Sequence, residues 1–330
     1  MAALAEVHKG TASRALNAST RSMVNARTVE RVVRAAEQLG YVPNTLARGL
    51  RTNSSMTVGV VIPDITNPLF PPLVRAIEAH LQPHGYSVLI ANTDGFAAGE
   101  RGALTSLLDR RVDGLIIASG QRDESPIADL YEAGVKVVLL NRDAGPVPYP
   151  LVAGNDASGI TAAVRSLHDL GHRRLLHIAG PSNLSTSTTR ADAFEAAWRS
   201  FGDMTGTVVI AQALSIEAGR AAMLPLLHDR SHGATGVVAS NDLIAVGILR
   251  AMRQTGIECP RDMSLIGFND VQFAEDLAPP LSTVRVPATS MGIRAAQLLL
   301  EALSGAEQVQ ETIMLPVSLI MRGSTAAVSG

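Results

Sequence analysis

Beyond Met56, this chain alternates short, continuously apolar runs with longer amphipathic stretches. The runs are rich in valine, isoleucine and leucine and lack polar alternation, which is typical of strands buried on both faces of a parallel sheet. The expected strands cover residues 58–62, 87–91, 114–118 and 135–140, and then 175–179, 207–211, 236–240 and 264–268. Because the pattern restarts after Asp156, it predicts an α/β body of two lobes, each a doubly wound parallel sheet.

The stretches between these runs have helical periodicity. We expect helices over residues 69–84, 99–110, 125–133, 157–170, 188–201, 216–228 and 243–255. In doubly wound sheets ligands bind beyond the carboxyl ends of the strands. The residues that directly follow each apolar run are therefore candidates for a binding site.

Composition excludes several classes of protein. No stretch approaches the roughly twenty uninterrupted apolar residues of a membrane-spanning helix, and the N-terminus lacks the pattern of a secretory signal. We therefore expect a cytoplasmic protein with no membrane partner. The single cysteine, Cys259, can form neither an internal disulfide nor a thiolate metal cluster, so a zinc finger is excluded as well.

Signatures of catalysis are missing where they would be expected. No Gly-x-Gly-x-x-Gly motif follows residues 58–62, and the chain has no phosphate-loop lysine and no nucleophile elbow. His168 and His172 have the spacing of metal ligands on a helix, but Gly171 is expected to end that helix between them. We expect no enzyme activity, no cofactor and no metal site.

Charge is distributed unevenly along the chain. Within residues 1–55, Lys9 and seven arginines face three glutamates, so this segment carries a formal net charge of +5 and the remainder −7. A basic segment of this kind favours a nucleic-acid partner.

The stretch Lys9–Asn17 has the pattern of a DNA recognition helix. Ala12, Ala15 and Leu16 share one face at helical spacing, while Lys9, Ser13 and Arg14 project from the other. Such a slim polar face fits a major groove about 12 Å wide, although a solvated surface helix has the same pattern. Met1–Ala5 is expected to be the tail of a preceding helix, with a turn at residues 6–8 in which His8 is a weak N-cap.

A third helix is expected over residues 26–39, with Asn25 as its cap and Gly40 as its stop. Residues 44–51 follow as a segment of doubtful helicity, because Gly49 weakens a helix by about 1 kcal/mol relative to alanine. Polar residues 52–55 are the expected linker. The organisation predicted is a helix-turn-helix domain over 1–43 with an incomplete first helix, a hinge helix and linker over 44–55, and a two-lobed effector-binding and dimerisation domain over 56–330.

Several phrases resemble one family over the whole chain. They are Lys9–Asn17, Ala35–Asn44, Ala47–Thr52 and Val58–Asp64 with Asn67-Pro68, and they are similar to the lactose-repressor (LacI/GalR) family of bacterial transcription regulators. Family members are cytoplasmic repressors with a helix-turn-helix head and a periplasmic-binding-protein-like body. The resemblance implies a double-stranded operator DNA partner, a homodimer and a small-molecule effector.

The resemblance also assigns DNA-binding residues. Lys9, Gly10 and Arg14 match base-reading positions, and Arg14 is the best candidate because a guanidinium can bind guanine O6 and N7 together. Thr11, Ser13 and Asn17 match positions directed at phosphates. In the family, the segment that matches Asn44, Ala47 and Leu50 is a hinge helix that folds only on DNA, with the leucine wedged into the minor groove.

Polar and aromatic residues follow the predicted strands of both lobes, as a site for a hydroxylated small molecule requires. The candidate effector residues are Asp64, Phe70, Asn141, Arg190, Asn241, Asn269 and Phe273. Turn and cap roles are the alternative for the aspartates, above all Asp64, Asp156 and Asp242. In the family, Arg190, Asn241 and Asn269 match effector contacts. Many sugar-binding relatives carry aspartate at the positions of Asn141 and Asn269, so Arg190 is expected to have few acidic companions here.

The sequence therefore predicts a ligand-responsive DNA-binding regulator, a repressor of a catabolic or transport operon with a sugar-like effector. One recognition helix covers few base pairs, which calls for a homodimer on two half-sites. The alternative is a two-lobed small-molecule binding protein whose truncated head does not bind DNA. Because only Ala2–Ala5 precede Glu6, we expect the true start, with the missing first helix, to lie upstream of Met1.

Overall fold

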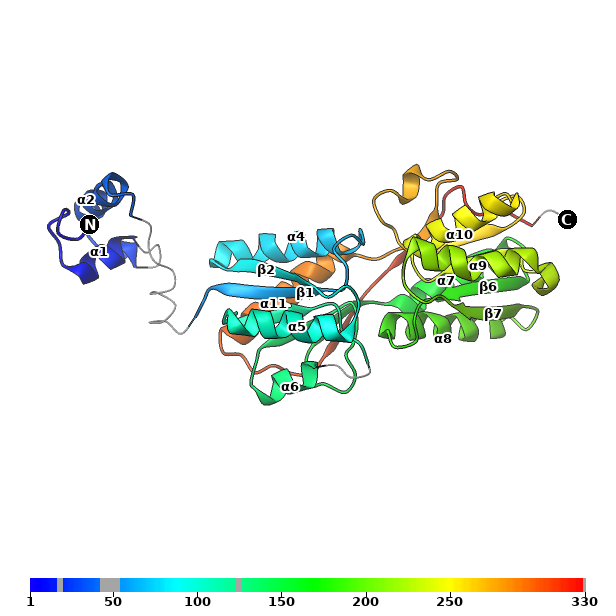
Figure 1. Cartoon of the computed structure of the whole chain (residues 1–330), viewed down its shortest axis with the longest axis horizontal. Coiled ribbons are helices and arrows are strands. Elements are labelled where there is room, and N and C mark those ends of the chain that lie inside the picture. Colours follow the sequence, from blue (N-terminus) through cyan, green and yellow to red (C-terminus); the bar gives the residue numbers. More distant parts are fainter. Residues whose placement is uncertain (17–19, 42–53, 123–125, 329–330) are drawn as a thin grey trace. The chain divides into compact units, whose positions relative to one another are not determined.

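The computed structural model of this protein describes residues 1–16, 20–41, 54–122 and 126–328 (Figure 1). The chain divides into two compact units, Met1–Ser55 and Met56–Gly330, hereafter the head and the body. In the described part of the chain, none of the helices combines the length and apolar character needed to span a membrane.

The described part of the head contains two helices and a short connecting turn: α1 at Lys9–Leu16, η1 at Arg21–Met23 and α2 at Ala26–Gln38. Ala12 and Ala15 of α1 are fully buried against Val29 and Val32 of α2. The predicted apolar face of the recognition helix is thus the face that packs. Small alanine side chains allow the two helices to approach closely.

Capping in the head agrees with the sequence at one helix and differs at the other. The Asn25 side chain accepts a hydrogen bond from Arg27 N (2.9 Å), and Gly40 ends α2 with φ of +56°, both as predicted. His8 was expected to be a weak cap, but its Nδ1 accepts from Gly10 N (3.2 Å). Met1–Ala5 forms a hydrogen-bonded turn, closed by Ala5 N and Met1 O (3.0 Å), and not the predicted helix tail.

The first lobe of the body is built on a six-stranded parallel sheet in the order β11-β5-β4-β3-β1-β2. Its strands are β1 Thr57–Ile62, β2 Ser87–Asn92, β3 Gly114–Ile117, β4 Val137–Leu140, β5 Leu151–Gly154 and β11 Thr312–Leu315. Its helices are α4 Phe70–Leu81, α5 Ala97–Asp109, α6 Ile127–Glu132 and α11 Ala288–Leu303, with η2 at Gln82–His84. Figure 1 shows α4 and α5 on opposite faces of this sheet, which explains why its strands are apolar on both sides.

The second lobe repeats this plan with the order β12-β10-β9-β8-β6-β7, in which only β12 is antiparallel. Its strands are β6 Arg174–Ala179, β7 Thr205–Ile210, β8 Gly236–Ala239, β9 Ser264–Asn269, β10 Ser282–Arg285 and β12 Ser318–Ile320. Its helices are α7 Asp156–Asp169, α8 Ser185–Arg199, α9 Ile216–His228 and α10 Asp242–Thr255, with η3 at Arg230–His232 and η4 at Ala274–Asp276.

The predicted fold class is confirmed: all eight expected strands form, in two doubly wound lobes. The expected helices form as well, with bounds that differ by a few residues. The sequence interpretation missed β5, β10, β11, β12 and α11. Of these, α11 and β11 come late in the sequence and yet complete the first lobe.

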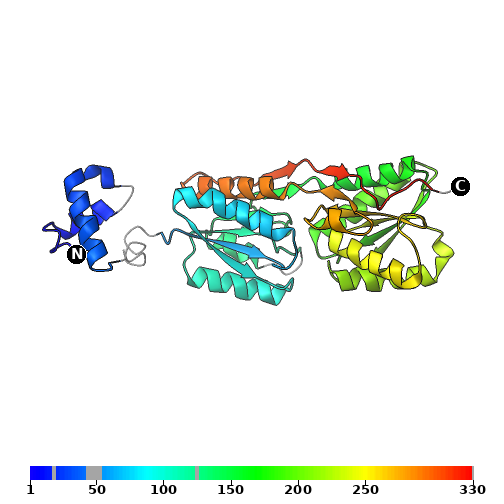
Figure 2. The same ribbon diagram turned by 90° about the horizontal axis from the view of Figure 1, so that it is seen from above.

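The chain passes between the lobes at three points, from β5 to α7, from β10 to α11, and from β11 to β12. These crossings lie side by side along one edge of the body (Figure 2). A Cβ on Gly154 would meet Val317 and Val286, and one on Gly159 would meet Val284 and Val317. The crossings therefore pack against one another where only glycine leaves room.

The α9–α10 pair is the most closely packed pair of helices in the second lobe. A Cβ on Gly247 would overlap the backbone of Ile216 and Arg220, and one on Gly219 would overlap the backbone of Ile244. No side chain can give way here, because the obstructing atoms belong to the main chain.

We predict that Gly247→Ala destabilises the body by about 2 kcal/mol or more, because the two helices must separate. The control is Gly102→Ala on the exposed face of α5, where a Cβ meets nothing within 4 Å. That control should instead stabilise by roughly 0.5–1 kcal/mol, because alanine restricts the unfolded chain. Urea unfolding of both variants measures the difference. Equal effects of the two substitutions would contradict the close helix contact.

Candidate functional site

The exposed face of α1 carries the first candidate site. Lys9, Ser13 and Arg14 are exposed, while Gly10 and Thr11 are half-buried. Within the described residues, neither Lys9 nor Arg14 forms an ion pair with an acidic side chain. The Thr20 hydroxyl donates to Arg14 O (3.1 Å) and satisfies a carbonyl at the helix end. The two cationic side chains are therefore available for a partner outside the head.

Four of the predicted DNA-binding residues are not placed by the structure. They lie outside the described residues: Asn17, Asn44, Ala47 and Leu50. The three arginines of α2 that face away from the head core, Arg27, Arg31 and Arg34, are exposed. Of these, Arg34 pairs loosely with Glu30 one turn away (3.8 Å), so the head presents mainly positive charge.

Arg190 lies at the centre of the second candidate site, in the body. Its side chain is 3% exposed, and its Nε and Nη2 both bind Asp156 Oδ2 (2.8 and 2.7 Å). Its Nη1 donates to the carbonyl oxygen of Ser240 (2.5 Å), and its guanidinium carbon lies 3.8 Å from the centre of the Phe268 ring. Arg190 thus joins the start of α7, the end of β8 and the end of β9.

Arg190 has one acidic partner in this geometry, Asp156. The Asp156 carboxylate binds the Arg190 guanidinium directly, although the sequence had indicated a turn or cap role for Asp156. Asn155 caps α7 instead, by accepting from Ser158 N (3.2 Å). Burial raises the pKa of Asp156, and the adjacent Arg190 guanidinium partly offsets this.

Asn241 and Asn269 follow β8 and β9, next to the residues that Arg190 contacts. Asn241 is 2% exposed; it caps α10 by accepting from Ile244 N (2.8 Å) and donates to Leu214 O (3.3 Å). Asn269 is 6% exposed, and its Oδ1 is enclosed without a hydrogen-bond partner among the described residues. A buried amide oxygen of this kind is available to accept a hydrogen bond from a ligand.

The backbone at Asn269 and Asp270 is held in an unusual conformation, with φ of +117° and +57°. Arg285 and Arg322 bind the Asp270 carboxylate from two sides (2.6 and 2.7 Å). Asp242 accepts from Val271 N (2.9 Å) and from the Thr283 hydroxyl (2.6 Å). These bonds hold the strained loop that carries Asn269. Asp242 therefore links α10 to β10 and to the loop after β9, and it is not the turn or cap residue that was expected.

Asn141 and Arg142 bring the end of β4 into the same region. Asn141 is 8% exposed with φ of +67°, and its backbone N donates to Val152 O (2.8 Å). Arg142 is 5% exposed and interacts electrostatically with Arg190 and with Glu100 of α5. Burial, and then the charge of Arg190, lower the pKa of Arg142 to about 10, so it stays protonated at neutral pH.

The remaining candidates lie in different surroundings. The Asp64 carboxylate accepts from Thr66 N (2.8 Å) and from its hydroxyl (2.7 Å), a local turn. Phe70 is 1% exposed and belongs to the core under α4. Phe273 is half-buried beside the core of the second lobe. Within the described part of the chain, none of these three forms a hydrogen bond, ion pair or ring contact with Arg190.

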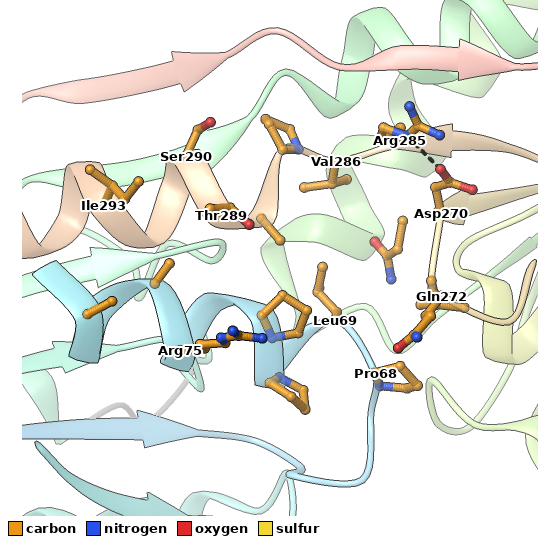
Figure 3. A pocket seen from close by; sticks show the side chains of 18 of the residues that line it. Pro68, Leu69, Arg75, Asp270, Gln272, Arg285, Val286, Thr289, Ser290 and Ile293 are labelled. Atoms are coloured by element: carbon orange, nitrogen blue, oxygen red, sulfur yellow. Dashed lines mark hydrogen bonds and ion pairs between the residues drawn. The ribbon is translucent and has the colours of Figure 1, made fainter.

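A groove of about 1020 Å³ lies between the lobes and includes Asn269 in its lining. Figure 3 shows Pro68, Leu69 and Arg75 on one side, Thr289, Ser290 and Ile293 on another, and the Asp270–Arg285 pair at one end. Its lining is mainly prolines, alanines and aliphatic residues, with a few polar groups. This volume is sufficient for a metabolite-sized ligand. Of the candidate effector residues only Asn269 lines this groove, and neither Arg142 nor Arg190 does.

Polar contacts also bridge the lobes directly. Arg122 forms a two-pronged pair with Asp143 (3.1 and 3.0 Å) in the first lobe and donates to the Thr188 hydroxyl (3.1 Å) in the second. Asp143 N donates to Ser185 Oγ (3.0 Å). The start of α8, two to five residues before Arg190, is thus bonded to the first lobe.

His168, His172 and Cys259 each contact groups within the body. His172 binds the Thr235 hydroxyl (2.8 Å) and Ala326 O (3.1 Å), while His168 stacks on Phe201 with ring centres 4.1 Å apart. No cluster of potential metal ligands occurs among the residues that the structure describes. Burial raises the pKa of the Cys259 thiol to about 12, which leaves it inert.

The candidate effector residues named from the sequence left out Arg142 and Asp156. Arg142 directly follows a predicted strand, which was a usable signal. The role of Asp156 had no such signal, because its partner Arg190 is 34 positions away in the sequence and meets it only through the packing of α7 on α8.

A helix-turn-helix head on a two-lobed α/β body that binds a ligand between its lobes defines a class of bacterial regulators. Residues 1–44 match the family model described as bacterial regulatory proteins, lacI family, and residues 164–325 match the periplasmic binding protein-like domain. The chain belongs to the lacI family of bacterial regulatory proteins, and it is a transcription regulator.

Similarity to individual proteins extends over the whole chain. An HTH-type transcriptional regulator in the aml 5′ region of Streptomyces limosus is 35% identical, over 99% of this chain and 93% of its own length. The lac repressor dimer bound to operator and the anti-inducer ONPF has 25% identity and a TM-score of 0.87, over 99% of this chain and 98% of that one. The complex of the transcriptional regulator CelR with cellobiose has 30% identity and a TM-score of 0.75, over 98% of each chain.

We predict that the stability of the body depends on pH through Asp242. Burial raises the pKa of this carboxyl to about 7, whereas in the unfolded chain it titrates near pH 4. The folded protein therefore holds the extra proton between these values, and the free energy of unfolding falls as the pH rises from about 4 to 7, by up to roughly 1.4 kcal/mol per pH unit.

Asp242→Asn should remove this loss, because an amide does not titrate. Urea unfolding across this pH range, with the exposed Asp192→Asn on α8 as a control, measures the effect. Parallel pH curves for wild type and Asp242→Asn would contradict it.

Proposed function

We propose that this protein is a cytoplasmic, dimeric repressor that binds double-stranded operator DNA through its head and a small polar metabolite between the lobes of its body. It controls a catabolic or transport operon and carries out no catalysis. The observation that carries the effector part of the proposal is the buried Arg190 with its partners at the ends of β8 and β9.

The DNA-binding part is supported by the charge and packing of α1. Its apolar face is used within the head, and its opposite face presents Lys9 and Arg14 without acidic partners among the described residues. A single short helix contacts few base pairs, so useful discrimination requires two copies on a two-fold symmetric site. The structural similarity to a lac repressor dimer bound to operator supports the same assembly here.

The effector part is supported by polar side chains from both lobes. Asn141 and Arg142 come from the first lobe, while Arg190, Asn241 and Asn269 come from the second. A ligand that contacts both sets binds one relative arrangement of the lobes better than another. Its differential affinity then shifts the population of those arrangements. The similarity to a cellobiose complex supports a sugar-like ligand.

The cross-lobe bonds of Arg122 and Asp143 couple ligand binding to the relative arrangement of the lobes. They hold the start of α8 to the first lobe, and Arg190 lies on the same helix. A ligand that rearranges the lobes must break or remake these bonds. The operator affinity of the dimer changes with them.

We predict that Arg14→Ala weakens binding to the preferred operator by about 1–3 kcal/mol and relaxes the preference at one base pair of each half-site. A base-reading guanidinium has this effect, because its loss removes discrimination as well as affinity. Operators selected from random duplex DNA, followed by fluorescence anisotropy with single-base variants, provide the measurement. Arg34→Ala, an exposed arginine of α2, is the matched control.

A uniform loss of affinity for all sequences, together with a shallower salt dependence, would assign Arg14 to a phosphate contact. Operator binding that is the same in wild type and Arg14→Ala would remove α1 from the DNA interface.

We predict that Arg190→Gln combined with Asp156→Asn abolishes the response to the effector and leaves operator binding nearly unchanged. The substitutions are paired because Arg190→Gln alone would leave the buried Asp156 carboxylate without its partner, at a cost of about 3–5 kcal/mol. Thermal stabilisation by a panel of sugars, sugar acids and nucleosides identifies the response in wild type. A ligand that stabilises the double variant equally would exclude Arg190 from the effector site.

A further inference from the structure

Arg142 is the one strongly buried cation of the body's described part without a partner of opposite charge. It is 5% exposed, and its Nε is fully enclosed without a hydrogen-bond partner. Its guanidinium forms no hydrogen bond and no ion pair with the residues that the structure describes, whereas the buried Arg190 has three such bonds. Burying an unpaired charge is costly, and proteins normally pair it.

Two of the three acidic residues nearby bind other arginines. Asp143, the next residue, binds Arg122 with both oxygens, and Asp156 binds Arg190. Glu100 attracts Arg142, but it forms no ion pair with it and accepts a hydrogen bond from Ser119 Oγ (2.5 Å). The repulsion from Arg190 lowers the pKa of Arg142 more than the attraction of Glu100 raises it. The Arg142 guanidinium therefore has no direct anionic partner among the described residues.

Several neutral side chains next to Arg190 are incompletely satisfied. Asn141 and Asn269, which end strands of the two lobes, are amides. Ser187 Oγ and Ser240 Oγ are enclosed without partners among the described residues, as is Asn269 Oδ1. Ser187 lies one turn before Arg190 on α8 and so shares its face, and Ser240 supplies the carbonyl that Arg190 binds. Hydroxyls can donate to an anion, and the amide oxygen needs a donor such as a ligand hydroxyl.

We propose that the effector of this regulator is a hydroxylated anion, a sugar acid or a sugar phosphate, whose carboxylate or phosphate is held by Arg142. The inference rests on the proposed function, because it concerns the ligand of the same site between the lobes. Arg142 is the residue that distinguishes the anionic ligand from its neutral parent sugar. Because Asp156 neutralises the charge of Arg190, Arg190 contributes only hydrogen bonds to the ligand.

The first measurement needs no ligand. Arg142→Gln in the full-length chain removes an unpaired buried charge, so the melting temperature of the ligand-free protein should stay the same or rise. Arg190→Gln, which breaks a paired site, should lower it by several degrees. A decrease for Arg142→Gln as large as that for Arg190→Gln would show that Arg142 has a structural partner, and would overturn the proposal.

The second measurement compares matched probes by thermal shift and calorimetry. The pairs are D-glucose with D-glucuronate and glucose 6-phosphate, D-galactose with D-galacturonate, and D-ribose with ribose 5-phosphate. An anionic member should bind wild type more tightly than its neutral parent, and Arg142→Gln should lose about ten- to one-hundred-fold in that affinity. The uronate and phosphate arms distinguish the two sources of the anion.

Two controls separate this site from other cationic surfaces. Arg199→Gln removes an exposed arginine that pairs with Glu195 on α8 and should bind the anions as wild type does. Arg142→Lys keeps the charge and should retain part of the affinity. Anions that bind the basic head affect wild type and Arg142→Gln equally, so the difference between these proteins reports on Arg142 alone.

Any panel in which wild type and Arg142→Gln respond alike, including one in which neither responds, overturns the proposal. A neutral sugar that stabilises both proteins and changes their operator affinity would overturn the anionic effector and leave the proposed function intact. Failure of wild type to select any duplex DNA would instead contradict the proposed function, whatever the anions do.

Discussion

The arrangement of the body depends on one buried ion pair, that of Arg190 with Asp156. In the described structure, the Arg190 guanidinium contacts three elements at once. It binds Asp156 in the first turn of α7, the carbonyl at the end of β8, and the ring of Phe268 on β9. A guanidinium offers five donors in a plane, which lets one side chain satisfy a carboxylate and a carbonyl and still stack on an aromatic ring. Neither Lys nor a neutral residue could make these contacts together. The strand ends that form the site are therefore positioned by electrostatics as much as by packing.

Much of the fold was accessible from the sequence because its cause is local. Apolar runs such as 58–62 and 264–268 are buried on both faces, and this leaves an uninterrupted pattern that few other structures produce. The cap at Asn25 and the stop at Gly40 depend on the chemistry of single residues and were also predicted correctly. The missed strands are short, with four residues or fewer, and α11 begins after Pro287 without a capping side chain.

The site was accessible only in part. Residues that follow strands could be collected from the sequence, and Arg190, Asn241 and Asn269 do meet near the ends of β8 and β9. Which of them are already paired is a question of three-dimensional distance. Asp156 and Asp242 looked like turn residues, yet one neutralises Arg190 and the other ties a strained loop to β10. Arg142 was not among the candidate effector residues, although its lack of a partner gives it the largest consequence for ligand chemistry.

The last forty residues of the described chain complete both lobes at once, because α11 and β11 close the first sheet and β12 closes the second. One edge of each sheet is therefore supplied by a segment far along the chain from the first strands, and this segment is shared by both lobes. We therefore expect the body to unfold as one cooperative unit, although its architecture looks like two repeated halves.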